Sequence, residues 1–463
     1  MQEIDLTLPL GSDQADNPAA GNARLINGYA EKMPPNSKSE WQIIARAGLT
    51  EFATLTGETD PIRAILPLTD AQALCVSGRV LYSVDTTGTA TSVGGIPSDG
   101  MVTMARNRAA SPQVAITCDG LSFVWQAGVL TQISDPDLPP AVSVAQIGGY
   151  FIWLLADGRH FASDVDDYAV NALSYATAEA NPDGGVRNIV RGNDMVFFGT
   201  RSIEFWQVTG DDPYPLARTT WRDNIGCIAG DSVAQVDQAV CFVAHDRTVR
   251  MLDGYDAQII SNYAVARAIA DLDDPSTIKA TSWQSRQHTF YAISTDDWTW
   301  IYDITTQRWH EAQTYGSSRW MIDRCAMWGT KILCGGAATG KLYLMDHTAH
   351  DDAGQPIRLV VQAGPIASFP NRLLHGRLDL DVVAATAPAG ETDAYVMIDW
   401  ADDDAENFGT QMMHFLGNKG QAMTKVRQFR LGSAFTRTYR FTMSSAIKRC
   451  VLGAKLQIEK AGS

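Results

Sequence analysis

A strand–turn–strand unit recurs seven times along the chain, and this repeat restricts the possible fold more than any other feature. Each unit begins with a nearly continuous apolar run, turns at Gly, Asp or a short polar pair, and ends with a strand that alternates apolar and polar residues. A continuous apolar run is typical of a strand buried on both faces, and a short polar turn is typical of a hairpin. The units occupy residues 72–85, 113–126, 150–164, 194–207, 239–253, 287–303 and 331–346, so that their last residues are 38 to 50 apart.

Further strands are expected on both sides of these hairpins. A looser strand follows most hairpins, such as residues 130–133 or 258–260. Four antiparallel strands in every 40–50 residues make the blade of a β-propeller. We therefore predict an all-β propeller, with seven blades favoured and six possible. The strands expected before the hairpins are residues 62–68, 101–106, 142–147, 186–190, 232–236, 277–283 and 324–328.

Two other all-β folds are alternatives to the propeller. A β-solenoid would need shorter periods and parallel strands, and two sandwiches would not explain seven hairpins in register. The sequence offers one helix candidate, residues 263–270, between two repeats.

The segments outside the repeat suggest three domains. Residues 1–48 are rich in Asn, Pro, Gly and Ser, which predicts an extended arm or a surface-docked segment. Residues 50–55 (TEFATL) read as a strand without a hairpin, and the seventh repeat lacks a clear fourth strand. We expect this strand to close the ring as the outer strand of the last blade, because an open ring would expose sheet edges. The predicted domains are an N-terminal arm with the closing strand (1–56), the propeller (57–355) and a C-terminal β-sandwich (356–463).

The expectation of a sandwich rests on short strands in close succession after residue 356. Seven strands in about a hundred residues are typical of that fold. They are expected at residues 357–361, 377–383, 395–400, 412–415, 425–430, 438–443 and 455–459.

Length and composition exclude several classes of protein. A chain of 463 residues is too long for one ordinary core, and its 45% apolar and 19% charged residues are typical of a globular protein. Seven scattered cysteines without a C-x-x-C pair argue against a zinc cluster or a disulfide framework, and they fit reduced thiols in a cytosolic setting. Because no apolar stretch approaches about 18 residues and the first residues carry acids without basic ones, we expect neither membrane insertion nor a secretory signal.

Charge is distributed unevenly. The 52 acidic residues exceed the 37 Lys and Arg by 15, which argues against a protein whose main role is to grip phosphates. Residues 407–463 nevertheless hold ten Lys and Arg against Glu459 alone, a local charge of +9. This segment is either a basic surface for a distinct partner or a solvated strand face.

Three motifs resemble chemical sites and are better explained as structure. Residues 335–341 (GGAATGK) approach a phosphate-binding loop, but Leu342 replaces the Mg²⁺-binding Ser or Thr and a strand follows, so a glycine-rich hairpin turn is favoured. The acidic run 402–404, with Glu406 and Asn407, lacks EF-hand spacing and is read as a turn. The His–acid pairs at 310–311 and 347–352 lack the helical spacing of zinc hydrolases.

We therefore predict no catalytic, cofactor-binding or metal-binding residues, no cofactor and no enzymatic activity. A glycosidase with acids and arginines at the central mouth of the propeller stays an alternative, because sequence does not place such a cluster. Eight tryptophans are concentrated in the later blades, where we expect them to wedge blades together or form an outer docking face; a carbohydrate platform is the alternative. They are Trp206, Trp221, Trp283, Trp298, Trp300, Trp309, Trp320 and Trp328.

Several short motifs resemble one family, the tail nozzle proteins of short-tailed bacteriophages, also called tail accessory factors or packaged-DNA stabilisation proteins. Residues 25–32 (LINGYAEK) resemble the family's N-x-Y-A-E-K opening, and Gly48, Leu49 and Phe52 resemble its P-G-L-x-x-F segment. Residues 61–65 (PIRAI) resemble the strand that enters the first blade. Residues 364–366 and 395–408 resemble its C-terminal strand and turn, although Ala47 replaces a usual Pro and residues 402–404 lack paired glycines.

The resemblance implies a structural role in the phage tail. Such proteins form a six-fold ring below the portal and its adaptor, extend the DNA channel, retain the packaged genome, and dock tail fibres or spikes and a plug or needle. The expected partners are thus further copies of this chain in a homohexamer, those tail proteins, and DNA in transient non-specific contact. The expected location is the virion tail, after assembly in the host cytoplasm. An acidic body would suit a conduit, since each Lys or Arg bound to a phosphate would slow the sliding duplex. A cellular binding scaffold and a glycan-cleaving or receptor-binding tail propeller are the alternatives.

Overall fold

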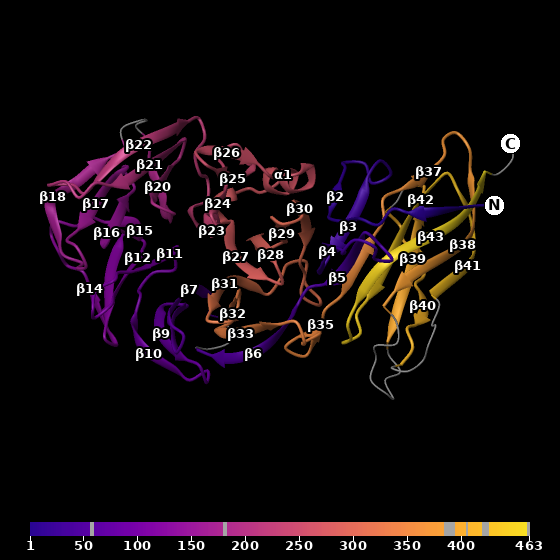
Figure 1. Ribbon diagram of the computed structural model, residues 1–463, viewed down its shortest axis with the longest axis horizontal. Coiled ribbons are helices and arrows are strands. Elements are labelled where there is room, and N and C mark those ends of the chain that lie inside the picture. The colour runs from indigo at the N-terminus through magenta and orange to yellow at the C-terminus, as the bar shows by residue number, and fades with distance from the viewer. Residues whose placement is uncertain (56–59, 179–182, 384–393, 404–405, 419–425, 461–463) are drawn as a thin grey trace.

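Seven four-stranded antiparallel units follow one another around a ring (Figure 1). This computed structural model describes residues 1–463 except 56–59, 179–182, 384–393, 404–405, 419–425 and 461–463, and the count refers to the described residues. The predicted all-β propeller is confirmed, with seven blades. Its innermost strands are β7 (Ile62–Thr69), β11 (Val102–Arg106), β15 (Ala141–Ile147), β19 (Gly185–Arg191), β23 (Ala234–Val236), β27 (Lys279–Ser285) and β31 (Ile322–Trp328).

The predicted hairpins form the middle of each blade. Their first strands are almost entirely buried, as their continuous apolar runs predict. These are β8 (Gln72–Ser77), β12 (Gln113–Cys118), β16 (Tyr150–Leu155), β20 (Asp194–Gly199), β24 (Ala239–Val243), β28 (His288–Ser294) and β32 (Lys331–Gly336). The third strands are β9 (Val80–Asp85), β13 (Leu121–Gln126), β17 (Arg159–Ser163), β21 (Ser202–Val208), β25 (Val249–Asp253), β29 (Thr299–Asp303) and β33 (Lys341–Asp346).

The outer strands complete the blades, and in blades two to five they are largely exposed. They are β10 (Ala90–Gly95), β14 (Val129–Gln132), β18 (Val170–Thr177), β22 (Leu216–Asp223), β26 (Asp256–Ile259) and β30 (Arg308–Glu311). The seventh outer strand comes from the N-terminal part of the chain: β6 (Gly48–Thr54) pairs antiparallel with β33. The strand expected at residues 50–55 thus lies where ring closure requires it.

Blade seven packs directly on blade one. β31 contacts β7, and the Trp328 indole nitrogen donates to the Thr69 carbonyl oxygen over 2.8 Å. Gly335 permits the close approach, because a Cβ there would lie 2.5 Å from the Ile62 side chain. The GGAATGK segment therefore belongs to the β32–β33 hairpin, and Lys341 pairs with Glu51 of the closing strand over 3.0 Å.

One α-helix interrupts the repeats among the described residues. α1 (Tyr263–Ala270) has the predicted bounds and is capped by the Asn262 side chain, which accepts from the Val265 amide over 3.0 Å. Two short 3-10 turns, η1 (Gly230–Ser232) and η2 (Pro275–Thr277), precede blades five and six.

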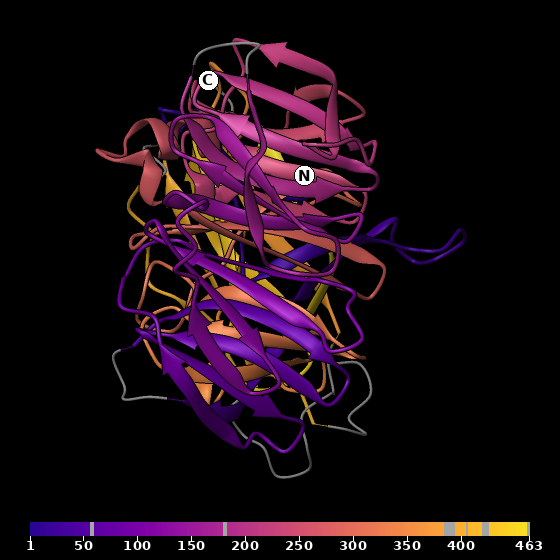
Figure 2. The same ribbon diagram turned by 90° about the vertical axis from the view of Figure 1, so that its left-hand side faces the viewer.

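The second domain is a sandwich of two sheets that share one core (Figure 1). In Figure 2 its orange and yellow strands lie behind the propeller. One sheet contains β4 (Gly28–Lys32), β5 (Trp41–Ala45), β43 (Cys450–Lys460), β38 (Leu373–Val382) and β41 (Val426–Ala434), with β1 (Gln2–Leu6) beside β43. The other contains β3 (Asn22–Ile26), β36 (Leu359–Gln362), β42 (Thr436–Met443), β39 (Tyr395–Asp402) and β40 (Met412–Phe415), with β2 (Asp13–Gln14) and β37 (Ile366–Ala367) at its sides.

The placement of residues 1–48 differs from the expected arm or docked segment. β1 to β5 are integral strands of both sheets, because their apolar side chains reach the shared core: Leu6, Leu25 and Ile43 are all buried there. β3 also joins the two domains, since it pairs antiparallel with β36 and, through Ile26 and Glu311, parallel with β30 of blade six. One hydrogen-bonded sheet thus runs from the propeller into the sandwich.

Candidate functional site: the axial cavity and the interdomain junction

A cavity of about 1010 Å³ lies at one end of the propeller axis, and charged side chains line much of it. It is bounded by the starts of the innermost strands and by the turns before blades five and six. Its ionisable lining residues are Asp60, Arg63, Arg79, Asp99, Asp231, Lys279, Asp296, Asp323 and Arg324.

Arg324 of β31 connects four blades across this cavity. Its Nε donates to the Arg63 carbonyl oxygen of blade one over 2.7 Å, and one Nη donates to the Ala280 carbonyl oxygen of blade six over 3.2 Å. The other Nη pairs with the Asp231 carboxylate of η1, next to blade five. The guanidinium is therefore a structural tie between adjacent blades.

Replacing Arg324 by Leu should lower the free energy of unfolding by about 2–3 kcal/mol, because Asp231 and two carbonyl oxygens would lose their donor in a largely buried place. Urea denaturation of the purified protein measures this. Arg79→Leu is the matched control: it breaks the exposed Arg79–Asp99 pair in the same cavity and should leave the midpoint unchanged. Equal midpoints for Arg324→Leu and the unaltered protein would contradict the assigned role.

The carboxylates of the cavity are mostly paired with cations. Lys279 Nζ lies 3.2 Å from Asp323, and Arg319 lies 3.6 Å from Asp296. The hydrogen bond from Arg79 lowers the pKa of the Asp99 carboxyl. A glycosidase acid must hold a proton at neutral pH, whereas these pairs favour the ionised carboxylate. Acids and arginines are therefore clustered at the central mouth of the propeller, as the glycosidase alternative requires. They form ion pairs with one another, however, which is typical of a structural role.

The interdomain junction is organised by a buried ion pair. The Arg46 guanidinium binds the Asp352 carboxylate of β34 (Asp351–Asp352) through contacts of 2.8 and 2.5 Å, and the two side chains are 9% and 1% exposed. Arg46 Nε also donates to Asn27 Oδ1 over 3.0 Å, and the guanidinium lies 5.2 Å from the Trp320 ring centre. β34 and β35 (Gln355–Pro356) form the turn that leads out of the propeller.

Asn27 satisfies backbone groups from both domains. Its amide nitrogen Nδ2 donates to the Arg358 carbonyl oxygen over 3.0 Å, and its Oδ1 accepts from the Gln313 amide over 2.9 Å. Asn27 has a φ of 57°, a left-handed conformation that Asn tolerates better than most residues. Arg24 adds a second pair across the junction, with Glu311 of blade six, over 2.5 Å. Propeller and sandwich are thus held by hydrogen bonds and charge pairs at the same place where β3 joins their sheets.

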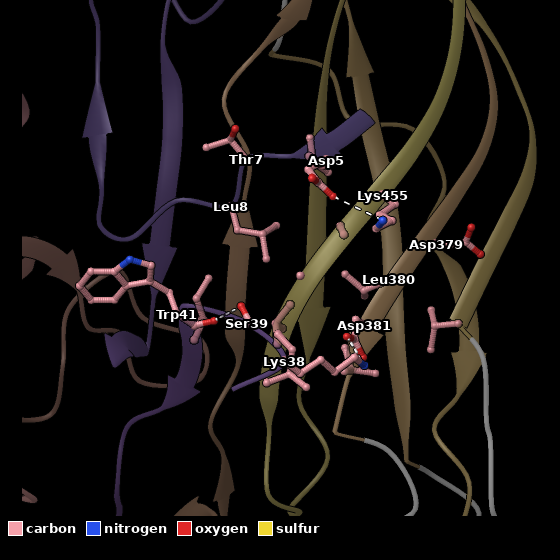
Figure 3. Close-up of a pocket in the computed structure, with 18 of the residues that line it drawn as sticks. Asp5, Thr7, Leu8, Lys38, Ser39, Trp41, Asp379, Leu380, Asp381 and Lys455 are labelled. Carbon is pink, nitrogen blue, oxygen red and sulfur yellow. Dashed lines mark hydrogen bonds and ion pairs between the residues drawn. The ribbon is translucent and has the colours of Figure 1, made fainter. Parts of the chain in front are cut away.

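The sandwich carries an apolar groove of about 670 Å³ (Figure 3). Leu8 from the N-terminal segment and Leu380 from β38 contribute to its wall. Charged residues stand at its edge: Lys38 pairs with Asp381, and Lys455 Nζ lies 3.9 Å from Asp5. This apolar wall contrasts with the charged lining of the axial cavity.

Comparison with known proteins places the chain in a phage family. The family model described as Bacteriophage P22 Gp10, beta-propeller, matches residues 22–350. The chain belongs to this family. It is therefore a bacteriophage β-propeller protein, as the short motifs suggested. A search of curated proteins found no match.

Three solved structures, two of them β-propeller domains, are similar to this chain at low identity. The WD40 beta propeller domain of Doa1 is 14% identical with a TM-score of 0.44, over 65% of this chain and 97% of that one. The Myceliophteria thermophila Cps50 (Swd1) beta-propeller domain is 10% identical with a TM-score of 0.43, over 64% and 99%. The computationally designed Ika8 protein is 14% identical with a TM-score of 0.37, over the same shares of the two chains.

Two of the family-like motifs lie at the two structural joints of the chain, the interdomain junction and the closing strand. LINGYAEK supplies Asn27 of the junction and strand β4, and Gly48, Leu49 and Phe52 belong to the closing strand β6. At Gly48 a Cβ would lie 2.4 Å from the Asp351 carbonyl oxygen, so the β6–β34 approach needs glycine. Sequence reasoning assigns no functional role to Arg46 or to Arg324, which it places only at the start of an expected strand, and it sets Asp352 aside with the isolated His–acid pairs. The signal toward Arg46 is its place between two of these motifs.

The motifs set aside as structural have structural partners. Asp402 binds Arg437, and Asp403 Oδ1 accepts from the Phe435 and Thr436 amides; Asp404 lies outside the described residues. Buried His310 has its pKa lowered to about 4 by desolvation, and His347 bonds with Ser285. Among the described residues, no group of three or more His, Cys, Asp or Glu is arranged to hold a metal ion.

The later tryptophans mostly lie between blades. Trp309 and Trp328 each donate an indole hydrogen to a carbonyl of the neighbouring blade or its linker, and Trp283 packs on Trp320 with ring centres 5.6 Å apart. Trp221 on β22 is 45% exposed. The expected wedge role therefore holds for the buried members.

The basic C-terminal segment is partly neutralised within its own domain. Four of its basic residues pair with acids that precede the segment or lie in β1: Arg427 with Asp379, Arg437 with Asp402, Arg440 with Asp399, and Lys455 with Glu3. Lys419 and Lys425 lie outside the described residues. Four of the ten basic residues are thus used to bind the strands of the sandwich together.

In the described ranges, none of the helices has the length and apolarity needed to cross a bilayer.

Proposed function

We propose that this protein is a structural subunit of a phage tail nozzle. In this role six copies form a ring below the portal and its adaptor, extend the DNA channel, retain the packaged DNA, and dock fibres or spikes and a plug or needle. The observation that carries the proposal is membership of the phage β-propeller family across residues 22–350. The protein acts without catalysis or cofactor, in the virion tail, after assembly in the host cytoplasm.

The architecture supports a role that requires stiffness. The propeller is closed by β6, and a continuous sheet with a buried ion pair couples it to the sandwich. We further propose that the chain functions as two rigid units, with residues 57–355 and β6 in the propeller and residues 356–463 with β1–β5 in the sandwich. Retained DNA touches the ring only transiently and without sequence preference.

The mass of the purified assembly tests the ring. Native mass spectrometry should find a species of six 50.3 kDa chains, and images of it should show six-fold rings. Mixing with the portal–adaptor complex should increase the hexamer fraction, because binding to the assembled form stabilises it. A chain that stays monomeric at micromolar concentration with and without that complex would contradict the nozzle, and cleavage of host glycans would favour the enzymatic alternative.

A further inference from the structure

Two cysteines of blade seven face each other across adjacent strands. Cys325 of β31 and Cys334 of β32 are direct partners in the antiparallel register, and their Sγ atoms lie 3.4 Å apart. The Cys325 amide donates to Thr281 Oγ1 of blade six over 2.6 Å, and its carbonyl oxygen accepts from the same hydroxyl over 3.3 Å. Because both backbone groups bind blade six and not β32, this is a non-hydrogen-bonded pair, the type whose Cα atoms approach to about 4.5 Å. A disulfide can span that separation.

Only one of the two thiols is open to solvent. Cys325 is partly exposed, whereas the other six cysteines are buried. Burial raises the pKa of the Cys334 thiol, which keeps it protonated at neutral pH. Burial has the same effect on the pKa of four further thiols, those of Cys75, Cys227, Cys241 and Cys450. An oxidant from solution therefore meets Cys325 first, and Cys334 is the thiol in contact with it.

The pair lies in the blade that closes the ring. β32 pairs with β33, and β33 holds the closing strand β6. Cys334 belongs to the apolar layer between blades six and seven, which contains Trp283 and Trp320, and Cys325 packs against this layer. A covalent bond between β31 and β32 would therefore reinforce the blade whose outer strand comes from the N-terminal part of the chain.

We propose that Cys325 and Cys334 form a redox site, at which a peroxide produces a reversible cross-strand disulfide in blade seven. Hydrogen peroxide oxidises the Cys325 thiolate to a sulfenic acid and is itself reduced to water. The Cys334 sulfur then attacks the Cys325 sulfur, an S–S bond forms, and the sulfenic oxygen leaves as water with the Cys334 proton. Two thiols and one peroxide thus give one disulfide and two waters. The dithiol is the form expected in a reducing cytosol, and the disulfide is the form expected in an oxidising medium. This inference does not depend on the nozzle function.

Thiol counting and peptide mapping of the full-length protein test the proposal. After treatment with hydrogen peroxide, the denatured protein should have two fewer titratable thiols, and a pair of peptides joined through Cys325 and Cys334 should appear. Dithiothreitol should restore both thiols. Cys450→Ser, which keeps a donor for Gln42 Oε1, is the matched control and should lose the same two thiols. An unchanged thiol count, or oxidation at other cysteines in place of this pair, would overturn the proposal.

Two variants test the order of the steps. In Cys334→Ser the second thiol is missing, so dimedone should trap a sulfenic acid at Cys325. Cys325→Ser should lose no thiols, because those that remain are buried. Loss of thiols from Cys325→Ser to the same extent as from the unaltered protein would show that Cys325 is not the point of attack. Should either variant fail to fold, the thiol count and the peptide map of the unaltered protein still decide whether the disulfide forms.

Thermal unfolding measures what the cross-link does. The oxidised protein should unfold about 2–3 °C above the reduced protein, because the bond closes a loop of about ten residues in a long chain. Cys325→Ser treated with peroxide in the same way should show no such rise. An oxidised midpoint equal to or below the reduced one would contradict the stabilising role of the disulfide.

Discussion

Arg46→Ala should lower the free energy of unfolding by about 3–5 kcal/mol, the range for removing one partner of a buried ion pair. The substitution would leave the Asp352 carboxylate, 1% exposed, without its counterion. It would also remove one of the two hydrogen bonds that Asn27 Oδ1 accepts, and it would empty the space over Trp320. Urea denaturation followed by tryptophan fluorescence measures the loss.

A double-variant cycle separates the ion pair from general truncation. Asp352→Asn alone should also destabilise, but Arg46→Ala with Asp352→Asn should lose clearly less than the sum of the two single variants, because the uncompensated charge is gone. Lys38→Ala, which breaks the exposed Lys38–Asp381 pair of the same domain, is the control and should hardly move the midpoint. Strict additivity of the two single effects would show that the pair does not hold the junction.

Deletion of residues 1–56 should abolish soluble folding. The deletion removes β6, which leaves β33 as an open edge of blade seven, and it removes β1 and β5 from β43 and β3 from β36. The shared core would also lose Leu25, which is fully buried; replacing such a residue by Ala typically costs about 2–5 kcal/mol. Exposed strand edges and apolar surface together favour aggregation.

Size-exclusion chromatography of the expressed variants measures this outcome. The matched control is deletion of residues 1–21, which removes β1 and β2 but keeps β3 to β6; it should yield folded protein with a lower unfolding midpoint. A monodisperse, cooperatively unfolding product of the 1–56 deletion would mean that the ring closes without β6.

The repeat could be predicted because its signals are local. A buried run, a short turn and an alternating strand are all visible within about fifteen residues, and α1 is marked by Asn262 at its start. The closing strand could be predicted for a related reason. The seventh repeat lacks an outer strand, and residues 50–55 read as a strand that has no hairpin of its own. The repeat pattern thus predicts the long-range pairing of β6 with β33, although neither strand carries a direct signal for it.

The junction and the axial cavity could not be predicted in this way. Arg46 and Asp352 are 306 positions apart, and neither stands in a pattern that marks a buried pair. Residues 1–48 read as an arm because their strands are short and rich in turn formers; their pairing depends on edges that β36 and β43 provide from the far end of the sequence. Arg324 resembles an ordinary polar position of an inner strand until the ring brings blades one, six and seven and the turn before blade five together around one axis.

The pairing of β1 and β5 with β43 has a consequence for the order of events during synthesis. At typical translation rates the ribosome delivers β43 on the order of tens of seconds after β1. Until then the earliest segment of the nascent chain has no place to pair, while the first six blades can already condense one after another. The sandwich is therefore completed only by the last strands to emerge, and a prematurely terminated polypeptide keeps its unpaired N-terminal strands open to chaperones and proteases.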